Sequence, residues 1–165
     1  MLRAGHSRKL ECPSGIERAA VKHLESDRHR RLCDVTAVAS RNGADELGAL
    51  ERLNSAGIKK LGVIHRGFST FEKIKYRNDP QWQVAIELRS RYPQLPFFVD
   101  PSHMAGSKDY IREISQRSLD LGFEGLMIES HCNPSCALSD AKQQLTPSEL
   151  SDMLYNQIKV RDKDS

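Results

Sequence analysis

Three short apolar segments of the sequence are each followed by ligand-type side chains: His65-Arg66, Asp100 to His103, and Glu129 to His131. In parallel α/β proteins the functional site is built at the carboxyl ends of the strands. A polar residue after one strand is ordinary, because strand ends are where polar residues begin. The same pattern after three strands predicts that these groups converge on one site.

His103, Glu129 and Asp140 would supply one imidazole and two carboxylates to such a site. This donor set suits Mn²⁺, Fe²⁺, Co²⁺ or Zn²⁺, and a cation of that kind polarises a carbonyl as a Lewis acid. Two of the three also have an ordinary explanation: His103 as a hydrogen-bonded core histidine, and Asp140 as a helix cap. We expect a divalent metal ion as the cofactor.

Arg66 lies beside Gly67 on the loop that follows the first of these segments. A guanidinium there holds a phosphate or a carboxylate through two parallel hydrogen bonds, although a surface ion pair is the simpler alternative. A phosphorylated substrate next to a divalent metal is therefore a reasonable hypothesis. His65 and His131 are the adjacent catalytic candidates, to orient a metal ligand or to handle a proton.

Two other patterns carry less weight. The spacing of Cys132 and Cys136 is not the usual Cys-x₂-Cys, and no second cysteine pair is placed to close a zinc site. The basic run from Arg28 to Arg31 has no interleaved aromatic residues, and the whole chain carries a net charge of only +3. We therefore expect a solvated basic surface and no nucleic-acid partner.

From Gly48 onward, strand, loop and helix repeat three times. Expected strands cover 61–64, 96–99 and 125–128, and expected helices contain Leu47, Leu50 and Leu53 or begin at Asn78-Asp79-Pro80, Ser107 and Thr146. Continuous apolar strands alternating with helices predict an α/β fold with a parallel sheet. A complete (β/α)₈ barrel takes roughly 200 or more residues, so a chain of 165 residues predicts a partial barrel or a small open sheet.

Residues 1–47 contain few large apolar side chains. Ile16, Ala20 and Leu24 are spaced for one helical stripe, and 35–38 reads as a strand. We therefore divide the chain into a divergent, weakly structured or helical segment 1–47, a domain 48–160 and a polar tail 161–165. No apolar run approaches the ~20 residues of a membrane span, and four cysteines without a secretory signal favour a cytoplasmic protein with no membrane partner.

The sequence resembles the type I 3-deoxy-7-phosphoheptulonate (DAHP) synthases, and is most similar to the branch fused to a chorismate mutase. The shared blocks, in order, are GALERL (48–53), GVIHRGFS (62–69), YRNDPQW (76–82), DPSH (100–103), GLMIESH (125–131), SDAKQQ (139–144) and Thr146-Pro147. The resemblance implies a TIM (β/α)₈ barrel, of which this chain would hold the last three strand–helix units.

The same resemblance implies a transferase that condenses phosphoenolpyruvate with erythrose 4-phosphate, the first step of the shikimate pathway of aromatic amino acid biosynthesis. It implies that Arg66 holds the phosphate of phosphoenolpyruvate, and that His103, Glu129 and Asp140 are three of four metal ligands. The fourth ligand, a cysteine on the first barrel strand, has no matching segment here. The family's Gly-Ala-Arg-Thr segment is also absent, and its Lys-Asn motif has at best a faint echo in Arg41-Asn42-Gly43. We therefore expect a fragment of a larger enzyme, with a homo-oligomer and an adjoining chorismate mutase domain as expected partners.

Two alternatives stay open. A related 3-deoxy-octulosonate 8-phosphate synthase would use a five-carbon sugar phosphate, although the wording of YRNDPQW and SDAKQQ favours the seven-carbon product. A catalytically inactive remnant, or a half-barrel that only associates with partner chains, is favoured for the isolated chain by the missing ligand and lysine.

Overall fold

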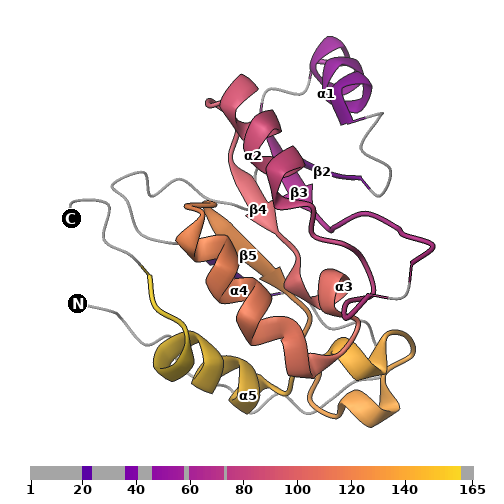
Figure 1. Cartoon of the computed structure of the whole chain (residues 1–165), viewed down its shortest axis with the longest axis vertical. Helices are drawn as coiled ribbons and strands as arrows, with labels where there is room; N and C mark the ends of the chain where they lie inside the picture. The colour runs from indigo at the N-terminus through magenta and orange to yellow at the C-terminus, as the bar shows by residue number, and fades with distance from the viewer. Residues whose placement is uncertain (1–19, 24–35, 41–45, 58–59, 73, 161–165) are drawn as a thin grey trace.

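The computed structural model describes residues 20–23, 36–40, 46–57, 60–72 and 74–160 (Figure 1). Its strands are β1 (Ala20–His23), β2 (Thr36–Ser40), β3 (Leu61–His65), β4 (Phe97–Val99) and β5 (Gly125–Ile128). Its helices are α1 (Glu46–Ser55), α2 (Trp82–Arg91), α3 (Pro101–Ala105), α4 (Ile111–Asp120) and α5 (Pro147–Asp152), which continues as a π-helical turn over Met153–Gln157.

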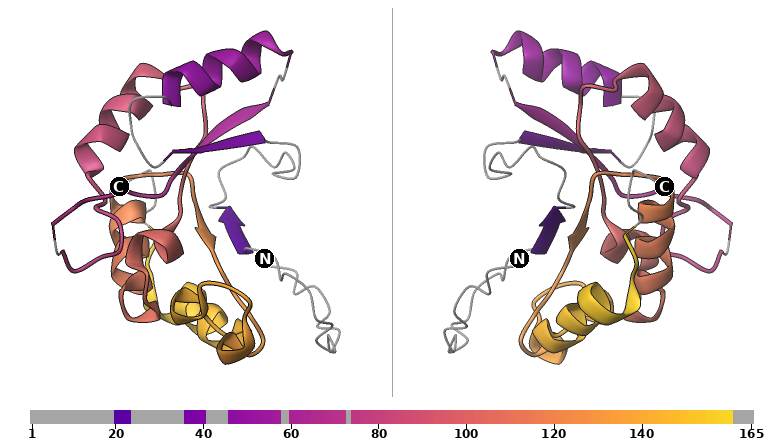
Figure 2. Two further views of the ribbon diagram at one scale, coloured as in Figure 1. Left: turned by 90° about the vertical axis from the view of Figure 1, so that its right-hand side faces the viewer. Right: turned by 90° about the vertical axis from the view of Figure 1, so that its left-hand side faces the viewer.

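The five strands form one sheet in the order β1-β5-β4-β3-β2. Neighbouring strands from β2 to β5 are parallel, and a helix connects each of them to the next. Helices α2 and α4 lie along the same side of the sheet in both views of Figure 2. The α/β prediction is therefore confirmed. The strand predicted at 35–38 is present as β2, and the helix predicted around Leu47, Leu50 and Leu53 is present as α1.

The core lies between the sheet and its helices. Phe97 and Val99 of β4 are completely buried, and Leu126 and Ile128 of β5 are 1% exposed. These side chains join one cluster with Ile111 and Ile114 of α4 and with Phe123, which precedes β5. Strands β4 and β5 are thus fixed at their centres by apolar packing, and their carboxyl ends emerge at a defined place.

The helical stripe predicted from Ile16, Ala20 and Leu24 is wrong where the structure describes it. Ala20–His23 form strand β1, antiparallel to β5, with Ala20 opposite Ile128 and His23 opposite Gly125. Three spaced apolar residues are a weak helix signal, whereas the outer edge of β5 offers a full row of backbone hydrogen-bonding groups. Ile16 and Leu24 lie outside the described residues.

The predicted helix start at Asn78-Asp79-Pro80 is also wrong, because α2 begins at Trp82 after a left-handed Gln81. The backbone N–H of Asn78 donates to Met104 O at 3.1 Å, and that of Asp79 donates to Phe68 O at 2.8 Å. These bonds hold the segment before α2 against two other parts of the chain. The carbonyl of Asp79, which a helix starting there would bond to a residue four positions later, instead accepts from the backbone N–H of Phe68 at 2.7 Å.

Other local expectations are confirmed. Thr146 and Glu149 form the predicted capping box at the start of α5. Ser107 caps the short 3₁₀ turn that leads into α4, and α1 is followed by Gly57 at a positive φ of 87°. Among the described residues, no helix is long and apolar enough to cross a membrane.

Candidate metal centre

The carboxyl ends of β3, β4 and β5 carry His65, Asp100 and Glu129. Asp100 is 2% exposed, and its backbone N–H donates to His65 O at 2.9 Å, which joins the first two ends. The backbone N–H of Glu129 donates to Ser102 Oγ at 2.9 Å, which joins the third. The predicted convergence of the three strand ends is therefore present in the backbone.

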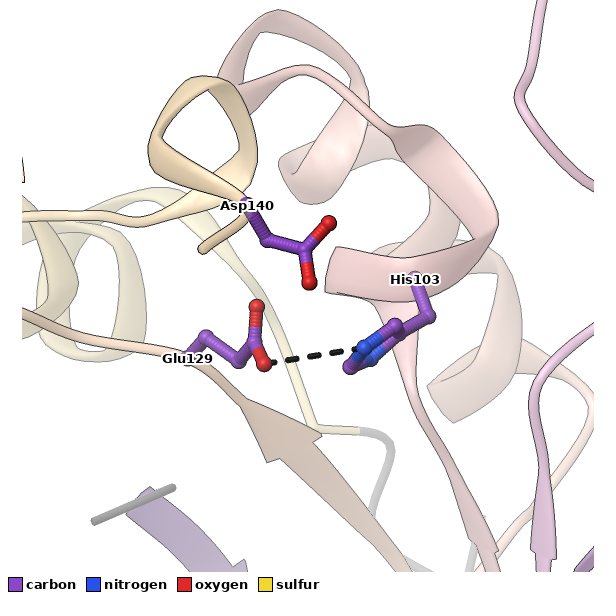
Figure 3. Close-up of side chains that lie close together, drawn as sticks. All are labelled: His103, Glu129 and Asp140. Atoms are coloured by element: carbon purple, nitrogen blue, oxygen red, sulfur yellow. Dashed lines mark ion pairs between the residues drawn. The ribbon is translucent and has the colours of Figure 1, made fainter. Parts of the chain in front are cut away.

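Asp100 orients His103. It caps α3 by accepting from the backbone N–H of His103 at 3.0 Å, and its other oxygen lies 2.7 Å from His103 Nδ1. In the neutral imidazole this contact favours the tautomer with a proton on Nδ1, which leaves the lone pair of Nε2 for a metal ion. His103 Nε2 lies 3.6 Å from Glu129 Oε1 and points into the space between the two acids (Figure 3).

His103, Glu129 and Asp140 converge as predicted. Each of the three is half-buried and offers one ligand atom, and these atoms lie within 4.8 Å of one another (Figure 3). Two ligand atoms at about 2.1 Å from one ion lie at most about 4.2 Å apart, so a small side-chain rotation closes the group around a cation. One imidazole and two carboxylates fit a borderline divalent ion, and the residues present therefore fit the predicted metal.

Asp140 stays ionised at neutral pH. Its backbone takes the left-handed conformation at φ 52°, which aspartate tolerates better than most residues. A hydrogen bond from Arg77 Nη1 to Asp140 Oδ1, at 2.7 Å, is the main cause that lowers the pKa of this carboxyl, and the charges of His103 and Arg66 lower it further. A charged carboxylate is the form that binds a metal.

Arg66 lies next to this group. Its Nε is 3.3 Å from Asp100 Oδ2, the oxygen that also contacts His103 Nδ1. Arg66 Nε is buried and has no hydrogen bond, and its side chain is 22% exposed. The carboxamide of Asn78 donates both to Arg66 O, at 3.3 Å, and to His103 O, at 2.9 Å. A cation held by His103 would therefore have a guanidinium as a close neighbour.

The two histidines predicted to be catalytic lie outside this group. His65 is 4% exposed and contacts the rings of Phe68 and Trp82. Its Nε2 lies 2.6 Å from Pro80 O, and burial lowers its pKa. His131 Nδ1 accepts a hydrogen bond from the backbone N–H of Asn133 at 3.0 Å. Their catalytic roles stay predictions.

The thiols of Cys132 and Cys136 are exposed and are not joined in a disulfide. Cys136 Sγ accepts a hydrogen bond from Asn133 at 3.1 Å. The three-residue group around His103 contains no cysteine, in a search limited to the described part of the chain. Cys12 and Cys33, to which no ligand role was assigned, lie outside that part.

Arg77, Asn78, Asp100 and Gln143 all bond to the site. No role was predicted for Arg77 or Gln143, Asn78 was predicted only as part of a helix start, and Asp100 only as one of the polar residues at a strand end. Each lies within a block that carries the family resemblance: YRNDPQW, DPSH or SDAKQQ. Their presence in those blocks was the feature of the sequence that could have indicated a role at the site. Only the folded chain brings these side chains next to the ligand group.

This chain is similar to known proteins in sequence and in fold. The model of the DAHP synthetase I family matches residues 37–163. Phospho-2-dehydro-3-deoxyheptonate aldolase of Thermotoga maritima is 32% identical over 112 residues, covering 68% of this chain and 32% of the relative. 2-Dehydro-3-deoxyphosphooctonate aldolase of Desulfotalea psychrophila is 24% identical over 132 residues, covering 71% of this chain and 44% of the relative.

Two solved structures from Thermotoga maritima share the fold. Phospho-2-dehydro-3-deoxyheptonate aldolase (DAHP synthase) superposes with a TM-score of 0.66 at 26% identity, over 77% of this chain and 40% of that one. A truncated form of 3-deoxy-D-arabino-heptulosonate 7-phosphate synthase gives 0.59 at 28% identity, over 76% and 51%. The chain thus spans less than half the length of either curated relative. Because the family model covers most of its residues, the chain belongs to the DAHP synthetase I family.

Proposed function

We propose that this chain supplies the metal site and the phosphoenolpyruvate-phosphate site of a DAHP synthase, as part of a larger catalytic unit. The observation that carries the proposal is the convergence of His103, Glu129 and Asp140 within 4.8 Å of one another. Arg66 supports it, since its Nε and Nδ1 of His103 both lie close to the same oxygen of Asp100, at 3.3 Å and 2.7 Å.

The reaction joins carbon 3 of phosphoenolpyruvate to the aldehyde carbon of erythrose 4-phosphate. Water adds at carbon 2, and inorganic phosphate leaves by cleavage of its carbon–oxygen bond. A metal ion bound by the three ligands supplies Lewis-acid polarisation of the aldehyde. Arg66 would hold the phosphate of phosphoenolpyruvate through its guanidinium, and so would orient the enol carbon toward the aldehyde.

Asp100 has a positioning part in this proposal. It accepts from His103 Nδ1 and lies against Arg66 Nε, so one buried carboxylate orients both the metal-binding imidazole and the phosphate-binding guanidinium.

The metal identity, the oligomeric state, the chorismate mutase domain and the cytoplasmic location stay predictions from the sequence.

The test is direct. Purified chain is mixed with Mn²⁺, phosphoenolpyruvate and erythrose 4-phosphate, and phosphate release is compared with that of a His103→Ala variant. Release above the variant supports catalysis by this chain. The absence of any excess, with Mn²⁺ binding intact, would favour the inactive or association-only alternative for the isolated chain.

A second candidate is the octulosonate reaction, since a relative named 2-dehydro-3-deoxyphosphooctonate aldolase covers 71% of this chain. The same assay with a five-carbon aldose phosphate in place of erythrose 4-phosphate separates the two. We expect the four-carbon aldehyde to be preferred, and preference for the five-carbon one would reverse the assignment.

A further inference from the structure

A chain of hydrogen bonds links the two carboxylates of the metal centre. Arg77 Nη1 donates to Asp140 Oδ1 at 2.7 Å and to Gln143 Oε1 at 3.0 Å. Gln143 Nε2 in turn donates to Glu129 Oε2 at 2.8 Å. Asp140 and Glu129 come from different segments, so Arg77 and Gln143 fix their separation.

The bonding leaves a ligand atom available on Glu129. Its Oε2 accepts from Gln143, whereas its Oε1 faces His103 Nε2 at 3.6 Å. A carboxylate held by one oxygen turns less freely about its terminal torsion. The oxygen that faces the imidazole is therefore oriented before any cation arrives.

Gln143 is a rigid spacer rather than an adaptable surface residue. It is 1% exposed, so an unpaired amide group there would be costly. Its oxygen must face the guanidinium of Arg77 and its nitrogen must face the carboxylate of Glu129, because a flipped amide would oppose donor to donor and acceptor to acceptor. The oxygen and the nitrogen of the carboxamide are therefore each fixed by one hydrogen bond, to Arg77 and to Glu129.

Packing fixes the base of Arg77. A Cβ added at Gly106, directly after α3, would lie 2.6 Å from Arg77 Cβ. The backbone N–H of Arg77 donates to Ala105 O at 3.3 Å. Arg77 is therefore seated on the end of the helix that carries His103, and its guanidinium reaches across to the acids.

We propose that Arg77 and Gln143 are positioning residues of the metal centre, which hold Glu129 and Asp140 at the separation that a cation requires. The inference rests on the proposed function, because it takes the group with His103 as the cation site. The positive charge of Arg77 also repels a cation. Its side chain is 47% exposed, so water and salt screen that repulsion, whereas the loss of its bonds would let two like-charged acids move apart.

The test measures the dissociation constant for Mn²⁺ by electron paramagnetic resonance in the full chain and its variants. Arg77→Met and Gln143→Leu are expected to weaken binding about 10- to 100-fold, as loss of an outer partner of a metal ligand does. Arg77→Lys is expected to keep most of the affinity, because one nitrogen makes both bonds and an ammonium has three donors.

A matched control comes from Arg89. Its Nη2 lies 2.8 Å from Glu124 Oε1, and this ion pair is not part of the metal centre. Arg89→Met removes the same cation from a comparable pair and is expected to leave Mn²⁺ binding unchanged. The visible spectrum of bound Co²⁺ is the second readout, since it reports ligand geometry. It should change in Arg77→Met and Gln143→Leu and remain constant in Arg89→Met.

Unchanged Mn²⁺ affinity and Co²⁺ spectra in both Arg77→Met and Gln143→Leu would overturn the inference and leave the proposed function intact. Tighter binding in Arg77→Met would overturn it too, by showing that charge repulsion dominates. If the wild type binds Mn²⁺ no more tightly than His103→Ala does, the group around His103 is not a cation site, and both proposals fail. If Gln143→Leu fails to fold, the comparison of Arg77→Met with Arg77→Lys decides, because Arg77 is half-exposed.

Discussion

Two arginine–carboxylate pairs lie at opposite ends of the same parallel strands. At the amino ends, Arg89 donates to Glu124 at 2.8 Å, and the other oxygen of Glu124 accepts from the backbone N–H of Phe97 at 2.8 Å. At the carboxyl ends, Arg77 donates to Asp140 at 2.7 Å. In the first pair, Glu124 also bonds to the backbone at the start of β4. In the second, Arg77 also bonds to Gln143, whose side chain bonds to the ligand Glu129.

The difference shows what makes an ion pair part of a site. Distance and partner type are nearly the same in the two pairs, so neither distinguishes them. The distinguishing property is that Asp140 faces further ligand atoms while Glu124 faces the backbone of its own sheet. This division follows the general rule that the carboxyl face of a parallel barrel carries chemistry and the amino face carries stability.

Substitution of the two glycines beside these arginines is expected to give the largest difference between the two ends of the sheet. Gly106 and Gly122 both have positive φ, of 68° and 76°. A Cβ at Gly106 would meet Arg77 Cβ at 2.6 Å, whereas one at Gly122 would meet only the guanidinium of Arg89, at an ordinary contact distance of 3.5 Å. We expect Gly106→Ala to cost about 2–4 kcal/mol and Gly122→Ala about 1–2 kcal/mol, both measured by urea unfolding.

Gly106→Ala should also weaken Mn²⁺ binding, because the clash displaces Arg77. If the two glycine variants lose the same unfolding free energy and bind Mn²⁺ equally well, Arg77 does not pack against Gly106 as the structure indicates.

Glu124→Ala tests the other side of the comparison. Removal of this carboxylate takes away the partner of Arg89 Nη2 and of the backbone N–H of Phe97, while Arg89 Nη1 keeps its bond to Leu121 O at 3.3 Å. We expect a loss of about 1–3 kcal/mol in unfolding free energy, measured by urea titration, and no change in Mn²⁺ affinity. A large fall in Mn²⁺ affinity at full folding would break the proposed separation between the two ends.

Glu149 gives the smallest effect and shows that a lowered pKa does not by itself mark the site. The backbone N–H of Thr146 is the main cause that lowers the pKa of this carboxyl to about 2, and Lys108 lowers it further. A lowered pKa in the folded state stabilises the protein above the ordinary pKa of 4.5, and this stability is lost as the pH falls toward 2.

The stability difference between wild type and Glu149→Gln should therefore be full at pH 7 and vanish near pH 2, as measured by urea unfolding across that range. Both Glu149 and Lys108 are about half-exposed, so the difference should stay below about 1 kcal/mol. A difference that grew on acidification would contradict the sign of this assignment.

Elements with a local cause could be predicted from the sequence. Continuous apolar runs gave β3, β4 and β5, and the Thr146–Glu149 spacing gave the start of α5. The strand ends likewise placed His103 and Glu129 correctly at one edge. These features depend on residues close together in the chain.

Features with a distant cause could not be predicted. Ala20–His23 form a strand because β5 offers an edge more than a hundred positions later in the sequence. Helix α2 begins late because the backbone of Asp79 is paired with that of Phe68. The link from Arg77 to Asp140 is of the same kind. No periodicity near Arg77 indicates which acid its guanidinium will reach.

An anomalous-diffraction map from a crystal of this chain soaked in Mn²⁺ tests whether the three ligands hold a cation. We expect a single strong peak bonded to His103 Nε2, a Glu129 oxygen and an Asp140 oxygen, with Arg66 alongside. A soaked crystal in which the manganese lies elsewhere, or in which these three side chains point away from one another, would contradict it.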